Sequence, residues 1–304
     1  MQHGGRGLNI HPAHPLARAL PLFLLAGLFL TALDTTAKYL VRDHSLFLVV
    51  WARYAGQMLV VTPFVRHRAG PGFWRTSNLK MQLVRSGFLL AATGCFFFGL
   101  RFLPLAEATA IMHIGPILIV LLSMPVLGER PTRARWAAAL VGFSGVLVLL
   151  RPGSSVLHPA VVLILGAAAC NALYQLLTRK LPGDSAYTTL FYSALAGAVG
   201  LTVALPWAFD GAGLSWSDAG LLLAMGLFAG LAHFLLITSF MMVPASLLTP
   251  FTYANLLWAT LFGYVVFGQL PDRWSALGMA IIVGSGVMLA LLERRRARLN
   301  RNFP

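Results

Sequence analysis

The sequence predicts an all-α polytopic membrane protein with ten transmembrane helices, arranged as two inverted five-helix repeats. Hydrophobic residues make up 58% of its 304 residues and charged residues only 11%, whereas an average soluble protein is about one-quarter charged. The few charges are unequal, with 23 Lys and Arg against 9 Asp and Glu. Sequence motifs also recur at a spacing of about 140 residues. This composition excludes a soluble enzyme, a disordered chain and a disulfide scaffold.

Ten apolar runs account for the predicted helices. The hydrocarbon core of a bilayer is about 30 Å thick, so each crossing helix needs roughly 20 apolar residues. In chain order the runs cover residues 19–41, 46–65, 84–100, 104–127, 136–150, 158–178, 187–206, 219–240, 245–267 and 274–292. The first run is too long for the apolar part of a secretory signal peptide, so we expect a retained helix. Cys95 and Cys170 both fall inside runs, so no disulfide is inferred.

Helix-breaking residues and tryptophans mark the ends of these runs. The breakers between runs are Gly70-Pro71-Gly72, Gly128–Pro131, Arg151-Pro152-Gly153, Leu181–Asp184 and Gly268–Asp272. The tryptophans near run ends are Trp74, Trp136, Trp207, Trp216 and Trp274. Amphipathic rings favour the membrane interface, so these positions support the predicted boundaries.

The distribution of positive charge predicts the orientation of the chain. An even number of spans places both termini on one side, and 17 of the 23 basic residues fall in segments on that side. The opposite side carries Arg42, Arg101, Arg151 and Arg273. Because cytoplasmic loops are enriched in Lys and Arg, both termini are predicted to lie on the cytoplasmic side. The membrane is predicted to be the inner membrane. The positive excess is then a topological signal, and no nucleic-acid partner is expected.

An internal repeat divides the chain into two halves. Residues 103–109 align with 243–249, and residues 127–133 align with 267–273, with a proline matching at both places and a glycine at the second. We expect a short tail at 1–18, repeats at 19–151 and 157–292, and a basic tail at 293–304. Since each repeat holds five spans, the second repeat enters the membrane upside down. Inverted repeats are characteristic of secondary transporters, whose sites lie near the midplane.

Several motifs of the first repeat resemble a known transporter family. They are Pro104–Ala110, Gly115-Pro116, Leu127-Gly128-Glu129-Arg130, Gly142–Val146 and Arg151-Pro152-Gly153. Together they resemble the EamA-type unit of the drug/metabolite transporter superfamily, and its tandem duplication covers roughly residues 20–292. In the second copy Gln269 replaces the Glu of the Leu-Gly-Glu motif, and the Gly-Pro pair is absent. The resemblance implies a secondary carrier of small metabolites, amino acids or drugs.

Two polar positions in the first two spans are candidates for a binding or coupling site. Asp34 and Lys38 are four residues apart and so share a helix face. Asp34 and Arg53 each lie about seven residues, or roughly 10 Å, from the adjoining span ends, which puts them at matching depth. One interpretation is an ion pair that holds the two helices together. The other is a polar cavity wall in which Arg53 binds a substrate carboxylate. The pattern Asp34-x-x-x-Lys38 with Trp51-Ala-Arg53-Tyr54 also resembles carriers of nucleoside-like or vitamin-like molecules.

A second candidate site lies where prolines interrupt corresponding helices of the two repeats. Pro116 follows His113 in the fourth span, and Pro250 precedes Tyr253 and Asn255 in the ninth. Proline removes a backbone hydrogen bond and tends to kink a helix. Paired interruptions at corresponding positions point to a transporter site. A packed, neutral His113 bonded to a neighbouring carbonyl is the competing interpretation.

The other polar residues inside spans have simpler interpretations. Glu107 lies near a span end and is expected to be solvated or interfacial. Asn171 and Gln175 share a face and are expected to form hydrogen bonds between helices. His233 has an unperturbed pKa suited to proton relay but no partner visible in the sequence. Glu129 with Arg130 is expected to form a helix-end salt bridge, and Gly226–Gly230 is expected to pack within the bundle.

The expected function is secondary active or exchange transport of a small polar metabolite or drug-like molecule by alternating access. Proton coupling could run through Asp34, Glu107 or His113, and facilitated exchange is equally allowed. A channel-like permease is an alternative. An intramembrane enzyme is disfavoured because HExxH, GxSxG and Cys/His ligand motifs are all missing from the sequence. We therefore expect no catalytic residues, metal or cofactor. The expected partners are the lipid bilayer and a small-molecule substrate, and a homodimer is left open.

Overall fold

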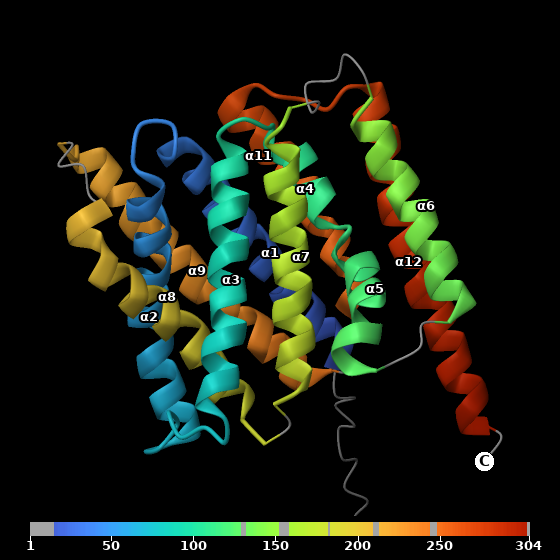
Figure 1. Ribbon diagram of the computed structural model, residues 1–304, viewed down its shortest axis with the longest axis horizontal. Helices are drawn as coiled ribbons and strands as arrows, with labels where there is room; N and C mark the ends of the chain where they lie inside the picture. Colours follow the sequence, from blue (N-terminus) through green and yellow to red (C-terminus); the bar gives the residue numbers. More distant parts are fainter. Residues whose placement is uncertain are drawn as a thin grey trace, which may run out of the picture.

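The computed structural model describes residues 15–128, 132–151, 158–181, 183–208, 213–243 and 248–302. These segments form a helical bundle without strands in the described residues (Figure 1). The first repeat contains α1 (Pro15–Leu40), α2 (Leu46–Ala69), α3 (Leu79–Leu100), α4 (Leu105–Met112), α5 (Gly115–Leu127) and α6 (Arg133–Leu149). The second contains α7 (Val161–Arg179), α8 (Ala186–Ala208), α9 (Trp216–Met242), the 3₁₀ helix η1 (Thr249–Tyr253), α11 (Ala254–Phe267) and α12 (Arg273–Asn302).

The described helices make ten passes, as predicted. Seven segments are long and apolar enough to cross a membrane, with α4 and α5 counted together as one pass. Phe251–Phe267 and Arg273–Leu289 are shorter apolar helices, and together with α6 they complete the ten. The third pass begins at Leu79 and not at 84, because the Asn78 side chain caps the backbone N–H of Met81. The last helix continues to Asn302, so the expected tail at 293–304 is mostly helical.

Some of the predicted features lie outside the described residues. They are most of the expected N-terminal tail at 1–18, together with Glu129, Arg130, Pro152 and Gly153. The bundle has two ends, which Figure 1 shows as upper and lower. The upper end carries the α1–α2, α3–α4 and α11–α12 connections. The lower end carries the α2–α3 and α7–α8 connections and the end of α12.

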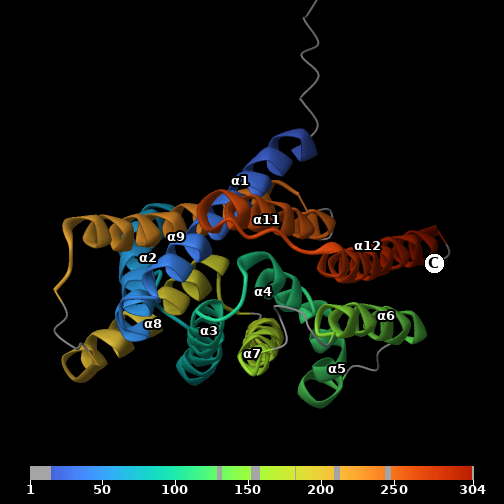
Figure 2. The ribbon, with the colours of Figure 1, turned by 90° about the horizontal axis from the view of Figure 1, so that it is seen from above.

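Helix packing follows the two-fold relation between the repeats. α1 packs on α9, and α3 packs in the same way on α7. α5 packs on α7, and its counterpart α11 packs on α1. α2 pairs with its own counterpart α8, and α6 pairs with α12 at one side of the bundle (Figure 2). The inverted repeat is therefore present in the contacts between helices as well as in the motifs.

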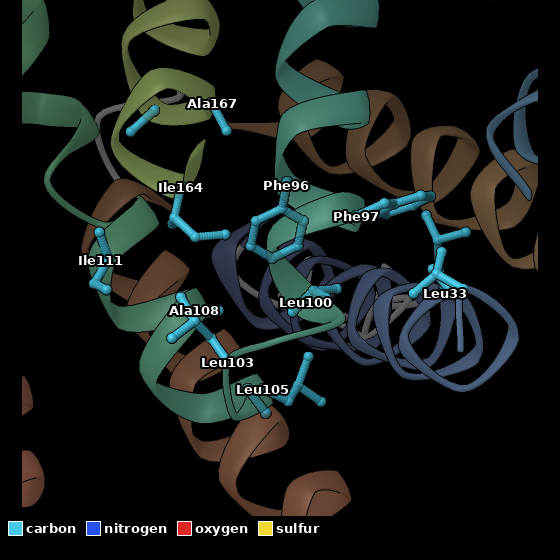
Figure 3. Packing of buried hydrophobic residues seen from close by; sticks show 14 of the residues in the cluster. Leu33, Phe96, Phe97, Leu100, Leu103, Leu105, Ala108, Ile111, Ile164 and Ala167 are labelled. Carbon is cyan, nitrogen blue, oxygen red and sulfur yellow. The ribbon is translucent and has the colours of Figure 1, made fainter. Parts of the chain in front are cut away.

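The apolar core lies where α1, α3, α4 and α7 meet. Phe96 and Phe97 of α3 lie between Ile164 of α7 and Leu33 of α1 (Figure 3). Leu105, which begins α4, is fully buried in the same cluster. This packing joins the two repeats across the centre of the bundle.

Glycines allow two of the helix pairs to approach very closely. A Cβ atom built on Gly56 of α2 would lie 2.4 Å from the Cα of Gly226 in α9. One built on Gly230 would lie 2.5 Å from the Val60 side chain. The Gly226–Gly230 pair therefore packs within the bundle, as predicted. The pair α6 and α12 has a similar crossing, because a Cβ on Gly145 would lie 2.8 Å from the backbone oxygen of Gly278.

The α2–α9 crossing predicts a strong effect of a single methyl group. Gly56→Ala should lower the stability of the folded protein by about 1–3 kcal/mol, because the rigid backbone of Gly226 occupies the space. Thermal unfolding of the detergent-solubilised protein measures this change. Gly87→Ala is the matched control, since nothing lies within 4 Å of a Cβ there and alanine is the better helix former. Equal melting temperatures for the two variants would contradict the prediction.

Candidate functional site

The two interrupted helices meet at the centre of the bundle. α4 ends at Met112 and α5 begins at Gly115, so His113 lies at the break that Pro116 predicts. In the second repeat, Pro250 lies in η1, which ends at Tyr253. The ring centroids of His113 and Tyr253 are 5.2 Å apart. These two residues correspond to each other in the repeat, so the structure brings the paired interruptions into direct contact.

Backbone carbonyls on both sides of this contact face the His113 ring. Nδ1 lies 2.8 Å from the Thr109 carbonyl oxygen, and Nε2 lies 3.3 Å from that of Thr252. A neutral imidazole has one N–H, so it donates to one of these carbonyls at a time. His113 therefore links α4 to η1, as the interpretation of a packed histidine expects. Asn255 turns away toward α1, where a Cβ on Gly27 would lie 2.2 Å from its Oδ1.

Arg53 lies buried beside aromatic rings. Its guanidinium donates from NH1 to Thr93 Oγ1 of α3 at 3.0 Å. The guanidinium carbon lies 4.5 Å from the ring centre of Tyr54 and 6.0 Å from that of Phe97. Its Nε has no hydrogen-bond partner among the described residues. The guanidinium is thus held in place but incompletely satisfied.

Asp34 and His233 lie within electrostatic range of Arg53. Within the described residues, no ion pair of 4.0 Å or less joins Asp34 to Arg53. The geometry therefore lacks the direct salt bridge of the first interpretation, and the polar wall stays a prediction. The Nδ1 atom of His233 in α9 lies 2.8 Å from the Ala229 carbonyl oxygen. We call Asp34, Arg53, Gln57, Thr93 and His233 the central polar cluster.

Gln57 belongs to this cluster one helical turn after Arg53. Its side chain is 1% exposed, and both amide atoms are buried without a hydrogen-bond partner in the part of the chain that the structure describes. The sequence interpretation missed this residue. The signal was its spacing, because a residue four positions after Arg53 lies on the same face of α2.

Lys38 has a different role from Asp34, although the two share a helix face. Its Nζ donates to the carbonyl oxygens of Leu100 at 2.8 Å and Leu103 at 2.5 Å. It also lies 5.4 Å from the ring centre of Phe267. Because α3 ends at Leu100, Lys38 caps the C-terminus of that helix, where a cation is favourable.

Three other expectations differ from the structure. Glu107 is only 3% exposed and its Oε2 has no described partner, so the prediction of a solvated carboxylate is wrong. The first turn of α4 is buried between α1, α7 and α11, which a count from the span end cannot reveal. Gln175 is exposed on α7 and Asn171 is half-buried. Neither side chain forms a hydrogen bond to another described residue, so the expected hydrogen bonds between helices are not found in the described part of the chain.

Arg85 is buried within α3. The count of 17 basic residues on the side of the termini included Arg85 as a residue of the loop before this helix, and that assignment is wrong. Its Nε donates to Gln82 Oε1 at 2.8 Å, and NH1 donates to Thr178 Oγ1 at 2.9 Å. NH2 donates to Ser193 Oγ at 2.6 Å and to the Thr189 carbonyl oxygen at 2.5 Å. Four described groups from α3, α7 and α8 therefore surround this side chain, and each guanidinium nitrogen has a hydrogen-bond partner.

Next to Arg85, an acid closes the lower end of the bundle. Asp184 accepts hydrogen bonds from the backbone N–H of Ser77 at 2.8 Å, from its hydroxyl at 2.9 Å and from Gln82 Nε2 at 2.7 Å, and also from the Thr76 hydroxyl. Partial burial opposes ionisation, but these hydrogen bonds outweigh it and lower the pKa of Asp184 to about 2. The contact joins the α7–α8 connection to the start of α3.

A corresponding contact closes the upper end. His44 in the α1–α2 connection lies 3.1 Å from Asp218 at the start of α9. Asp218 also accepts a hydrogen bond from the Ser215 hydroxyl at 2.6 Å. The repeat relates His44 to Asp184 and the start of α9 to the start of α3. Each end of the bundle is thus closed by the same pair of elements, taken from opposite repeats.

Comparison with known proteins identifies the family. The model of the EamA-like transporter family matches residues 17–151 and 158–291. The chain belongs to the EamA-like transporter family. The matched segments coincide with the two repeats, so this protein is a multi-pass membrane transporter of small metabolites and not an enzyme.

Several curated transporters are similar to this one over most of its length. An S-adenosylmethionine uptake transporter of Rickettsia felis is 29% identical over 90% of this chain and 92% of its own. A riboflavin transporter of Vibrio cholerae is 30% identical over 95% of this chain and 98% of its own, and a riboflavin transporter of Rhizobium johnstonii is 28% identical. A protein of known crystal structure matches with a TM-score of 0.66 at 23% identity, covering 92% of this transporter and 98% of that chain. This last match supports the fold.

The capping role of Lys38 predicts a loss of stability without a change in substrate affinity. Lys38→Met removes the donor for two buried carbonyl oxygens, which should lower the free energy of unfolding by about 1–3 kcal/mol. Thermal unfolding and substrate binding to the purified transporter measure the two effects. Lys80→Met is the matched control, because Lys80 is exposed. A stable Lys38→Met variant with weakened binding would instead make Lys38 a substrate ligand.

Proposed function

We propose that this transporter is a carrier whose two inverted halves alternately expose the central polar cluster to the two sides of the inner membrane. The observation that carries the proposal is Arg53, a buried guanidinium with an unpaired Nε, near a carboxylate with which it forms no direct ion pair. A charge inside a membrane span is costly unless it is paired or serves a pathway. Arg53 and Asp34 therefore suit a cargo that brings the missing partners.

The closed ends of the bundle support alternating access. The lower contact, at Asp184, and the upper contact, between His44 and Asp218, join the same elements of opposite repeats. Breaking one contact while keeping the other would open the cluster to one side only. The close crossing of α2 and α9 at Gly56 keeps the helices around the cluster together during such a movement.

We propose a small polar metabolite with a planar heteroaromatic ring as the cargo. The similar proteins are named as carriers of S-adenosylmethionine and of riboflavin, and each of these compounds contains such a ring with a polar chain. Asp34 offers a negative group and Arg53 a positive group, so a tail with charges of both signs fits the cluster best. S-adenosylmethionine carries such a tail.

The described charges support an orientation with both termini in the cytoplasm. At the lower end, Arg66, Arg68, Arg75, Lys80, Arg179 and Lys180 are exposed. The upper end carries Arg42, Arg101, Arg151 and Arg273. The removal of Arg85 from the loop charges reduces this asymmetry by one residue and leaves its sign unchanged.

Counterflow in proteoliposomes tests the carrier. Vesicles loaded with unlabelled S-adenosylmethionine or riboflavin should transiently accumulate the labelled compound above equilibrium, and the initial rate should saturate. This result is expected because a carrier exchanges substrate through one site. The channel-like alternative predicts equilibration without overshoot. An absence of counterflow with both compounds and with a panel of nucleosides and amino acids would contradict the proposal.

The same assay tests the role of Asp34. Asp34→Asn should lower the initial rate at least tenfold, since an amide cannot supply the negative charge. Asp43→Asn is the matched control, because Asp43 is exposed in the α1–α2 connection. Full counterflow by Asp34→Asn with an unchanged pH dependence would remove Asp34 from both binding and proton coupling.

Reporter fusions at the C-terminus test the orientation. A fluorescent protein fused after residue 304 should fold and fluoresce, because the positive-inside bias places that end in the cytoplasm. An alkaline phosphatase fused at the same position should be inactive. A dark fluorescent fusion with an active phosphatase fusion would reverse the proposed orientation.

A further inference from the structure

We propose that Gln57 is a specificity-determining residue, which binds the hydrogen-bonding edge of a planar heteroaromatic ring in the cargo. This inference rests on the proposed carrier function and adds to it a residue that recognises the ring by hydrogen bonds. Arg53, one turn away on the same face of α2, then lies beside the ring and binds the polar tail. The argument follows from the position of Gln57, from its unpaired amide and from the chemistry of an amide group.

Gln57 lies between the two contact faces of α2. Gly56 packs against Gly226 of α9, and the Tyr54 ring packs against Gly197 of α8, where a Cβ would lie 2.4 Å from the ring. Successive residues of a helix are about 100° apart around its axis, since a turn contains 3.6 residues. Gln57 therefore projects between α8 and α9, toward the helices of the bundle and away from lipid. Its 1% exposure agrees with this direction.

The unpaired amide is the feature that a folding role does not explain. Nearly all buried polar groups in proteins have hydrogen-bond partners, and leaving one unsatisfied costs about 1–3 kcal/mol. Gln57 leaves both Nε2 and Oε1 without a described partner. On α3, the buried Ser86 hydroxyl also has no described partner for its oxygen. A ligand that reaches Gln57 can supply the bonds that its amide lacks.

The chemistry of the amide selects the ring edge. An amide presents a donor and an acceptor side by side, and it pairs in a bidentate manner with an adjacent acceptor and donor, as glutamine does with adenine. A carboxylate has only acceptor atoms, so it can pair with the amide N–H and leaves the amide oxygen without a partner. The better partner for a carboxylate is the Arg53 guanidinium. An alkyl group satisfies neither amide atom. The cluster thus matches a ring edge at Gln57 and an anionic group at Arg53.

A near-isosteric substitution separates binding from folding. Gln57→Met keeps the linear shape of the side chain and removes both unsatisfied atoms, so the thermal unfolding temperature of the variant should be equal to or higher than that of the unmodified transporter. Gln175→Met is the matched control, because Gln175 is exposed on α7. Binding is measured with two probe pairs on the full-length protein in detergent. The pairs are riboflavin with 3-methylriboflavin, and adenosine with purine riboside.

The second member of each pair lacks one ring donor. The unmodified transporter and Gln175→Met should bind the complete ring at least tenfold more tightly than its partner in one pair or both, and in Gln57→Met this ratio should fall to about one. A ratio that is unchanged in Gln57→Met, or an unmodified transporter that binds none of the four probes, would overturn the inference. If other metabolites then show counterflow, the carrier proposal stands although the inference about Gln57 fails. The carrier proposal itself fails only if no compound shows counterflow.

Discussion

The structure depends on one constraint, which is that a polar group in the bilayer core must find its partner inside the protein. Two buried arginines show the two ways in which this chain meets it. Arg85 donates from Nε, NH1 and NH2 to four groups of three helices. Arg53 donates from NH1 to Thr93 and keeps an unpaired Nε. The first pattern is that of a residue that holds helices together, and the second is the pattern expected of the ligand-binding residue proposed above.

The two arginines lie in different parts of the bundle. Arg85 and Asp184 are linked through Gln82 at the lower end, and Arg53 lies at the centre. The contacts that close the two ends correspond by symmetry but differ in chemistry. At the lower end, Asp184 accepts hydrogen bonds from hydroxyl, amide and backbone N–H groups, whereas at the upper end a histidine, His44, contacts Asp218. The duplication thus preserved the position of each contact and not its chemistry.

The sequence predicted the features that depend on position along a helix. The ten passes, the breaks at His113 and Pro250 and the correspondence of His113 to Tyr253 all follow from hydropathy, proline and the spacing of the repeat, whereas the direct contact of the two rings is seen only in the structure. The errors at Glu107 and Arg85 have a common cause. Both lie close to a span end, and a count of residues places such positions near the interface. Their burial depends on the short α3–α4 turn and on the packing of α7 and α8, which are tertiary features.

Gln57 was missed for a related reason, since glutamine inside a span is common as a hydrogen-bonding residue between helices. What distinguishes it is the absence of a described partner for either amide atom, and a sequence carries no such information. The same reasoning divides Asp34 from Lys38. The four-residue spacing places them on one face, but the long side chain of Lys38 reaches the carbonyls at the end of α3, whereas the short Asp34 reaches no described partner. The length of the side chain, and not the spacing in the sequence, therefore distinguishes Lys38, which stabilises the fold, from Asp34, the candidate ligand.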